Sequence, residues 1–150
     1  MNKVLLLLIA ILAINCKTSE KHLKMENEEP LLISKGNLFG AGAEDIKKQN
    51  LIILNQNDWN ALLTKMNSIN KVTDDFTETE IDFKIYRIIA VFDELKTTGG
   101  HSIELDFKTN SQNVLVKVNY KSPNGMAVSA MTQPYYIAKI PNNNLPIQFN

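Results

Sequence analysis

The sequence predicts an α+β fold, made mainly of antiparallel sheet with one principal amphipathic helix. Two observations predict it. Apolar residues recur at the i, i+3, i+4, i+7 spacing of one helix face in a single place, at Trp59, Leu62, Leu63 and Met66. Residues 102–108 and 113–121 instead alternate apolar and polar side chains, as strands buried on one face do. Turn-forming residues separate these strands, so we expect sequential antiparallel neighbours.

The helix has a defined start in the sequence. Asn55 is suited to the N-cap position, and Asp58 falls at the third helical position, where a carboxylate meets free backbone N–H groups and the positive end of the helix dipole. Leu54 and Trp59 flank this cap and are predicted to form a hydrophobic staple. A Trp in such a stripe is expected in the core.

The strands are expected in chain order. The segment 31–34 is a short strand, and the glycine-containing segment 35–45 is interpreted as a mobile loop or a wide hairpin, since it lacks the ending of a Walker loop. Leu51–Leu54 is strand-like, and the apolar run Ile88–Phe92 predicts a central strand buried on both faces. TNSQ and SPNG supply turns. The last two strands are predicted within PYYIAKI and LPIQF, and all of these strands are expected to be antiparallel.

The N-terminus has the pattern of a bacterial lipoprotein signal. Lys3 precedes an apolar run, Val4 to Ile14, that is about half the roughly 20 residues a membrane-spanning helix needs, and a cysteine follows at position 16. We therefore expect a signal peptide at 1–15 and acylation of Cys16, palmitate included. The residues before the cysteine match the usual pattern imperfectly, and the alternative is a plain signal peptide. The implied location is the bacterial cell envelope, anchored by lipid to the outer membrane.

Composition divides the rest of the chain. Residues 16–30, the lipidated cysteine and a charged segment, are expected to be a tether that cannot bury enough surface to fold, and residues 31–150 a single α+β domain. Cys16 is the only cysteine, which excludes an intramolecular disulfide. Without Lys3, fifteen basic residues face sixteen acidic ones, with no basic patch for nucleic acid.

The stretch TTGGHSI raises the question of a phosphate-binding or catalytic loop. Gly99 and Gly100 are followed by a strand pattern rather than a helix, so they are interpreted as a structural turn. His101 is expected at the edge of the core. The only other histidine, His22, lies in the tether, so we expect no nucleophilic catalysis, no metal site and no cofactor. Paired carboxylates, Asp74 with Asp75 and Glu104 with Asp106, are interpreted as solvated faces.

A candidate interaction patch is predicted near the C-terminus. Its residues are Thr132, Gln133, Pro134, Tyr135 and Tyr136. Consecutive tyrosines on a strand point to opposite faces, so one ring is expected in the core and the other outside. An exposed tyrosine beside a rigid proline and hydrogen-bonding side chains is a mix that anchors interfaces. The alternative is that a helix or loop covers that face, and both rings are core.

From Leu51 to the C-terminus the chain resembles the PrcB-like family, the C-terminal domain of a protease-complex subunit found in bacterial lipoproteins. The resemblance is carried by NDWNALL, IDF with RIIAVF, TGGHSI and TQPYYIAKI. It implies a non-catalytic, lipid-anchored interaction subunit that stabilises or assists a secreted, subtilisin-like protease or another envelope protein. The alternative function is a stand-alone envelope binding module for a small ligand or peptide, and an enzyme is the third.

Overall fold

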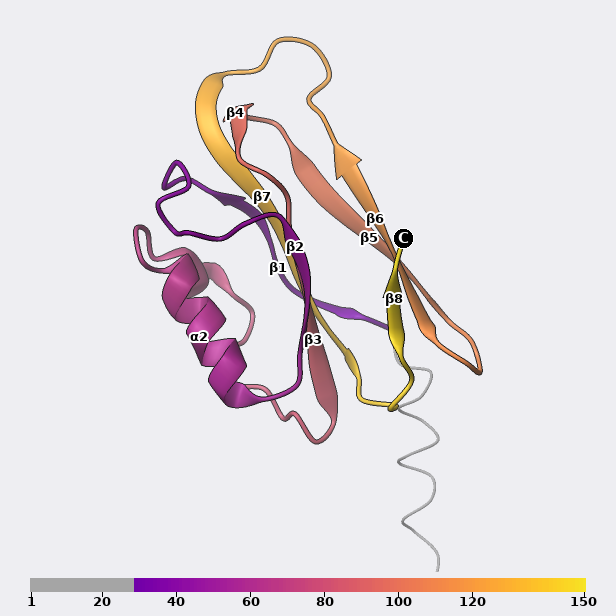
Figure 1. Cartoon of the computed structure of the whole chain (residues 1–150). Helices are drawn as coiled ribbons and strands as arrows, with labels where there is room; N and C mark the ends of the chain where they lie inside the picture. Colours follow the sequence, from indigo (N-terminus) through magenta and orange to yellow (C-terminus); the bar gives the residue numbers. More distant parts are fainter. Residues whose placement is uncertain (1–28) are drawn as a thin grey trace, which may run out of the picture.

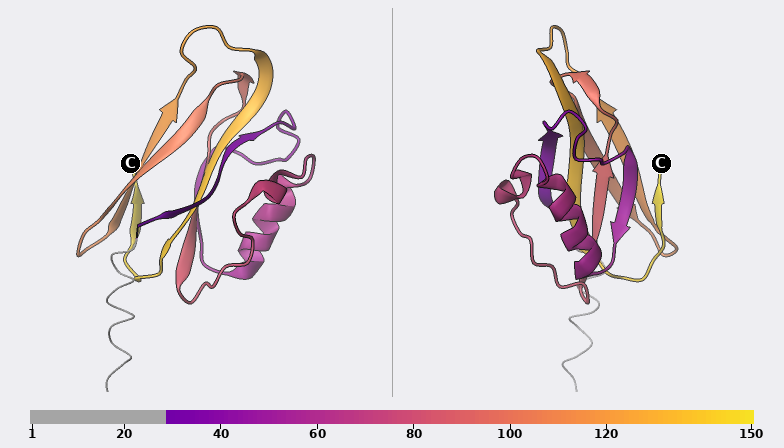
Figure 2. Two further views of the ribbon diagram at one scale, coloured as in Figure 1. Left: turned by 180° about the vertical axis from the view of Figure 1, so that it is seen from behind. Right: turned by 60° about the vertical axis from the view of Figure 1, so that its left-hand side comes forward.

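The computed structural model describes residues 29–150, which form three layers. A single α-helix covers one face of a central sheet, and a smaller second sheet covers the other face (Figure 1). The two further views in Figure 2 show the same order of layers from behind and from the helix side. One helix with mostly antiparallel strands confirms the predicted α+β class.

The elements follow one another along the chain without repeats. In order they are β1 (Leu31–Leu38), β2 (Gln49–Ile53), α2 (Gln56–Met66), the 3₁₀ helix η1 (Val72–Asp75), β3 (Tyr86–Phe92), β4 (Lys96–Thr98), β5 (Ser102–Thr109), β6 (Val114–Lys121), β7 (Ser129–Pro141) and β8 (Ile147–Phe149).

The central sheet has the strand order β1-β7-β3-β2, and all of its neighbours are antiparallel. The long strand β7 lies in its middle. Its C-terminal part pairs with β3, and its N-terminal part pairs with the short strand β4, which the sequence did not predict. Between β3 and β4 the chain leaves the ladder for three residues, beginning with Asp93.

The second sheet has the order β5-β6-β8. The predicted hairpin of β5 and β6 is confirmed, and the N–H of Asn110 donates to the carbonyl of Asn113 across its turn at 3.0 Å. The expectation that all strands are antiparallel is wrong for β8, which runs parallel to β6. β7 lies between β6 and β8 in the sequence and belongs to the other sheet. The chain therefore comes back to the second sheet from β7, and β8 runs in the same direction as β6.

Two hydrophobic cores fill the spaces between the layers. Strand β3 contributes to both, because alternate side chains point to opposite faces. Ile88, Ala90 and Phe92 pack towards the helix with Trp59, while Ile89 and Val91 pack between the two sheets. The segment Ile88–Phe92 is fully buried, which confirms the predicted two-sided strand.

The predicted helix start is confirmed, but the staple is not. The Oδ1 of Asn55 accepts a hydrogen bond from the N–H of Asp58 at 2.9 Å, and its Nδ2 donates to the Asp58 carboxylate at 2.8 Å. Trp59, Leu62 and Met66 are buried on the central sheet. Leu54 remains 57% exposed, so it does not anchor the helix entry.

Strand β1 is longer than predicted, which corrects part of the interpretation of residues 35–45. The strand continues through Lys35 and Gly36 to Leu38, and only the residues after it form a loop. Gly36 lies opposite Tyr135, and a Cβ at this glycine would lie 3.3 Å from the tyrosine hydroxyl. The tyrosine ring therefore fills the space that the missing side chain leaves on β1.

Candidate interaction surface

The predicted patch is largely inside the protein. Tyr136 is half-buried, and the other four members of the patch are buried: Thr132, Gln133, Pro134 and Tyr135. The alternation of the tyrosines is as expected, since Tyr135 faces the helix-side core and Tyr136 the core between the sheets. The prediction of an exposed patch is therefore wrong, because the helix layer covers one face of β7 and the second sheet covers the other.

These residues instead tie distant segments to β7. The Nε2 of Gln133 donates to two backbone carbonyls, that of Ile46 at 2.6 Å and that of Asp93 at 2.9 Å. The hydroxyl of Thr132 donates to the carbonyl of Thr98 at 3.0 Å. The carbonyl of Pro134 accepts from the N–H of Asp93 at 3.0 Å. The TQP segment thus fixes the loop before β2, the break after β3, and β4.

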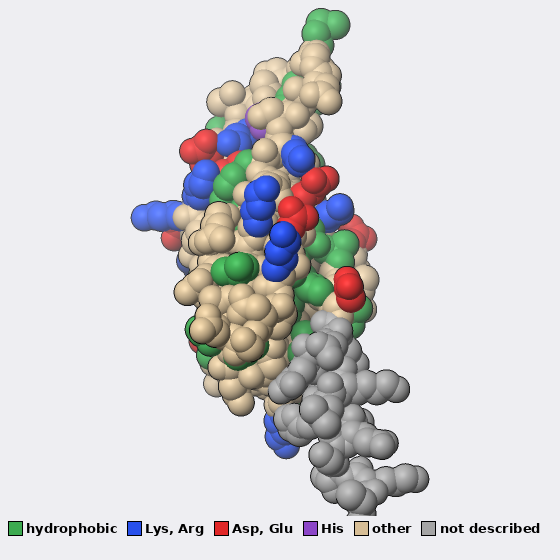
Figure 3. Space-filling model, turned by 90° about the vertical axis from the view of Figure 1, so that its right-hand side faces the viewer, with side chains coloured by type: hydrophobic (Ala, Val, Ile, Leu, Met, Phe, Trp, Pro, Cys, Tyr) green, Lys and Arg blue, Asp and Glu red, His purple; other side chains and the backbone are tan. Residues whose placement is uncertain are grey.

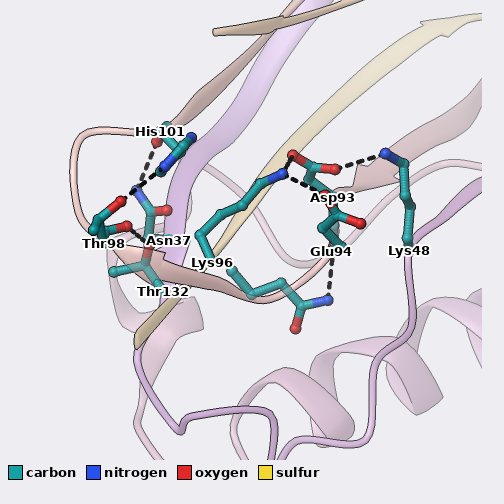
Figure 4. A network of polar contacts seen from close by, with 9 residues as sticks. Asn37, Lys48, Asp93, Glu94, Lys96, Thr98, His101 and Thr132 are labelled. Carbon is teal, nitrogen blue, oxygen red and sulfur yellow. Dashed lines mark hydrogen bonds and ion pairs between the residues drawn. The ribbon is translucent and has the colours of Figure 1, made fainter. Parts of the chain in front are cut away.

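A buried carboxylate lies at the break after β3 (Figure 4). The two oxygens of Asp93 pair with two lysines, Oδ1 with Lys48 Nζ at 2.9 Å and Oδ2 with Lys96 Nζ at 3.0 Å. Lys96 also pairs with the exposed Glu94 at 2.8 Å. The Asp93 side chain is only 3% exposed, so the two lysines close it off from solvent. Sequence reasoning missed this cluster, whose only local signal is the acidic pair directly after a buried strand.

The electrostatics of this cluster favour the charged forms. Burial on its own would raise the pKa of Asp93, but hydrogen bonds from Lys48 and Lys96 outweigh it and lower that pKa overall. The pKa of Lys96 is raised, chiefly by its hydrogen bond to Glu94. A general acid needs a pKa raised towards neutrality. The two ion pairs, together with the lowered pKa, therefore favour a charged Asp93 carboxylate held by the two lysines.

The two glycines form a turn, as the sequence predicts, but only one requires positive φ. Gly100 has φ 80°, a conformation that L side chains rarely adopt. A Cβ there would also lie 2.9 Å from Pro123 Cβ, and a Cβ on Gly99 would lie 3.0 Å from Val128 Cγ2. Both glycines therefore permit the turn to pack against the segment between β6 and β7.

His101 lies at the edge of the core, half-buried, and its contacts are internal. Its Nε2 lies 3.1 Å from the hydroxyl of Thr98, and its backbone carbonyl accepts from Nδ2 of Asn37 at 3.3 Å (Figure 4). Ser102, the next residue, is exposed on the other face of the strand. The structure therefore does not bring a serine and a base together at this turn.

The carboxylate pairs named from the sequence lie on solvated faces. Asp74 and Asp75 are exposed in η1, and Glu104 and Asp106 are exposed on the outer face of β5. Glu104 pairs with Lys121 at 3.4 Å, and Asp106 accepts from Asn119 at 2.9 Å. Within residues 29–150, no three His, Cys, Asp or Glu side chains gather as a metal site would require.

The segment from the end of β6 to the start of β7 exposes three apolar side chains that the sequence analysis did not single out. Met126 is fully exposed, Val128 is 73% exposed and Met131 is 45% exposed, and we call these three residues the apolar tip. The segment forms the upper end of the molecule in Figure 1. The signal in the sequence is the run MAVSAM, in which apolar residues directly follow a turn. The three residues lie within positions 126–131, and exposed apolar surface that is concentrated in one place marks interaction sites, whereas scattered single residues do not.

Cys16 and the tether segment 16–28 lie outside the described residues. The described residues, 29–150, contain no helix that could span a bilayer.

The elements from β3 to β7 carry the turn, the buried carboxylate and the apolar tip, and comparison with known proteins singles out the same range. Residues 87–141 match the family model described as PrcB C-terminal. These residues belong to the PrcB C-terminal family. The PrcB C-terminal match contains RIIAVF, TGGHSI and TQPYYIAKI, the segments that carry the resemblance in this part of the chain. No curated protein and no solved structure matches the chain.

Proposed function

We propose that this protein is a non-catalytic interaction subunit of the bacterial cell envelope. It is anchored by lipid at Cys16 and stabilises or assists a secreted protein, with a subtilisin-like protease as the first candidate. Membership of residues 87–141 in the PrcB C-terminal family supports a protease-associated role. The observation that carries the proposal is the apolar tip. Covering its exposed methionine and valine side chains with a partner removes apolar surface from water, which favours binding.

Residues within the family match, 87–141, form hydrogen bonds with the base of the tip. The N–H of Gly99 donates to the carbonyl of Val128 at 3.0 Å, and Thr98 in β4 is the register partner of Ser129 in β7. The hydroxyl of Thr132 reaches back to Thr98. The TGG turn and the TQP segment therefore hold the base of the tip in place. A fixed base lowers the entropy cost of presenting the tip to a partner.

The position of the tip suits an anchored protein. In Figure 1 the tip lies at the upper end of the molecule, whereas β1 begins in its lower half. An anchor on the chain before β1 would join the domain away from the tip and leave the tip free for a partner. Figure 3 shows the side of the second sheet, where Lys, Arg, Asp and Glu side chains are interspersed. Such a surface is better suited to contact with water than with an apolar partner.

The test substitutes residues of the apolar tip and measures whether a partner still co-purifies. The double variant Met126→Asp with Val128→Asp adds charge to exposed side chains and should leave thermal stability near that of the wild type. We expect it to lose co-purification of an envelope protease identified by mass spectrometry. Ile69→Asp is the matched control, since Ile69 is 50% exposed and lies after the helix. Equal recovery of the protease with all three proteins would contradict the proposal.

A further inference from the structure

Strand β5 lies at an open edge of the second sheet. It pairs with β6 and with no other strand among residues 29–150. On the far side of β6, the N–H of Val114 donates to the carbonyl of Pro146, and the N–H of Val118 donates to the carbonyl of Asn150. The carbonyl of Val116 accepts from the N–H of Asn150. These three valines therefore direct their backbone groups away from β5.

The register fixes which β5 residues have free backbone groups. In an antiparallel pair, residues that do not bond each other direct their N–H and C=O groups outward. Leu105 is the partner of Val118, Phe107 of Val116 and Thr109 of Val114. Their backbone donors and acceptors therefore point out of the open edge. Within residues 29–150 no backbone hydrogen bond reaches them.

This edge borders a cleft whose lining is partly apolar and partly charged. The cleft has a volume of about 870 Å³ and lies where the two sheets separate. Its apolar lining comes from Pro30, Leu105, Phe107, Leu115, Val118 and Tyr136, and its polar lining from Glu29, Asp106, Lys108, Lys117 and Asn150. The side chains of Leu105, Phe107 and Tyr136 are only half-buried, so the core between the sheets is incompletely covered here.

We propose that this cleft binds an extended peptide segment of a partner protein by strand addition to β5. The peptide's backbone pairs with the outward groups of Leu105 and Phe107, and every second side chain, apolar and of the size of valine or leucine, enters the cleft above Tyr136. Strand addition of this kind draws affinity from the main chain and specificity from alternate side chains. The inference rests on the proposed function, because it gives the partner a second point of contact.

The chemistry of the edge favours an extended peptide of a partner over other occupants. Donors and acceptors that repeat at every second residue match another strand, whereas a compact small molecule satisfies few of them. The chain's own segment 17–28 contains seven Lys, Glu and His residues, and its only apolar side chains are Leu23 and Met25. Two apolar side chains are too few to place one at every second position along the apolar part of the cleft.

The first test uses the full chain and a synthetic probe. The probe is a capped, fluorescent octapeptide in which valine alternates with threonine, and binding is measured by fluorescence anisotropy. Two further peptides carry backbone N-methyl groups on all odd or on all even residues. Because only every second residue of an added strand bonds β5, we expect one methylated peptide to bind like the parent and the other to lose affinity by at least about tenfold, or about 1.4 kcal/mol. No binding of the parent peptide, or equal binding of both methylated peptides, would overturn the proposal.

The second test changes β5 itself. Leu105→Pro removes an N–H that points out of the sheet, a position where an edge strand tolerates proline. Leu105→Ala is the matched control, since it removes a similar amount of side chain and keeps the N–H. We expect the proline variant to bind the probe at least about tenfold more weakly than the alanine variant, a loss of about 1.4 kcal/mol. Equal binding by two variants that both unfold cooperatively would overturn the proposal, and if the proline variant fails to fold, the methylated peptides decide.

Two controls separate this proposal from its neighbours. Leu23→Ser with Met25→Ser should leave probe affinity unchanged, and a clear gain would mean that the chain's own tether occupies the edge, which overturns the proposal. The tip variant Met126→Asp with Val128→Asp should bind the probe as the wild type does. If the probe fails to bind while the tip variant still loses the protease, the strand-addition proposal falls and the proposed function stands.

Discussion

The carboxylate of Asp93 and the ammonium of Lys96 lie 3.0 Å apart in a site where the aspartate side chain is only 3% exposed. The pair joins the end of β3 to the start of β4, and Lys48 completes it from the loop before β2. It holds the chain where β7 changes its pairing partner.

The Asp93 cluster should make stability depend on pH in the acid range. The pKa of the Asp93 carboxyl is lower in the folded protein than the ordinary value of about 3.9, so the unfolded chain binds the proton more readily. The cluster's stabilisation is therefore present above that value and is lost as pH falls through it towards the folded pKa. Urea unfolding at a series of pH values should show a steeper acid loss for the wild type than for Asp93→Asn.

The same substitution should lower stability at neutral pH by about 3 kcal/mol, because it removes the charge that two lysines enclose. Glu94→Gln is the control, since that side chain is exposed and its removal should change little. Similar unfolding of the Asp93 and Glu94 variants would refute the structural role of Asp93.

The turn glycines should differ according to their backbone conformation and neighbours. Gly100→Ala should destabilise by about 1 to 3 kcal/mol, since the new Cβ meets both positive φ and Pro123. Gly125→Ala shares the positive φ, 92°, but meets nothing within 4 Å, so it should cost less. Thermal unfolding of the two variants separates backbone strain from the clash. An equal loss would remove the contact with Pro123 from the account.

Gln133 should contribute more to stability than an exposed glutamine on a strand. Gln133→Leu leaves two buried carbonyls without their donor, which costs about 1 to 3 kcal/mol for a buried group. Gln148→Leu is the matched control, since Gln148 is exposed in β8 and accepts only from Asn113 at 3.2 Å. Chemical denaturation should show a clear difference between the two. Unchanged stability of Gln133→Leu would contradict the assigned role.

Lipid attachment is predicted at Cys16. Cys16→Ser should abolish metabolic labelling with a fatty acid and release the protein from membranes, because each buried CH₂ of an acyl chain contributes about 0.8 kcal/mol to membrane binding. Labelling that persists in the serine variant would exclude acylation at this residue.

Local patterns predicted the elements well, because they depend on residues close in sequence. The stripe from Trp59 to Met66, the Asn55 cap and the alternation in β5 are all set by neighbours along the chain. The burial of Tyr136 was not predictable in this way, since the second sheet that covers it comes from distant segments. Likewise the parallel pairing of β8 depends on the path of β7.

The sites show the same division. The turn at Gly100 could be inferred from the strand pattern that follows it, and its positive φ agrees with that inference. The ion pair of Asp93 with Lys48 joins residues 45 positions apart in the sequence, and no periodicity links them. The apolar tip was visible as a run of letters, but its exposure depends on the absence of a covering element in the described fold.

Contact between the apolar tip and a partner in the cell envelope can be tested in intact cells. The most direct measurement is site-specific photo-crosslinking in intact cells, with the crosslinking residue placed at Met126 and, as the matched control, at the exposed Ile69. We predict one dominant adduct at position 126 that contains a secreted protease and is absent at position 69. No adduct at position 126, or the same adducts at both positions, would contradict the claim.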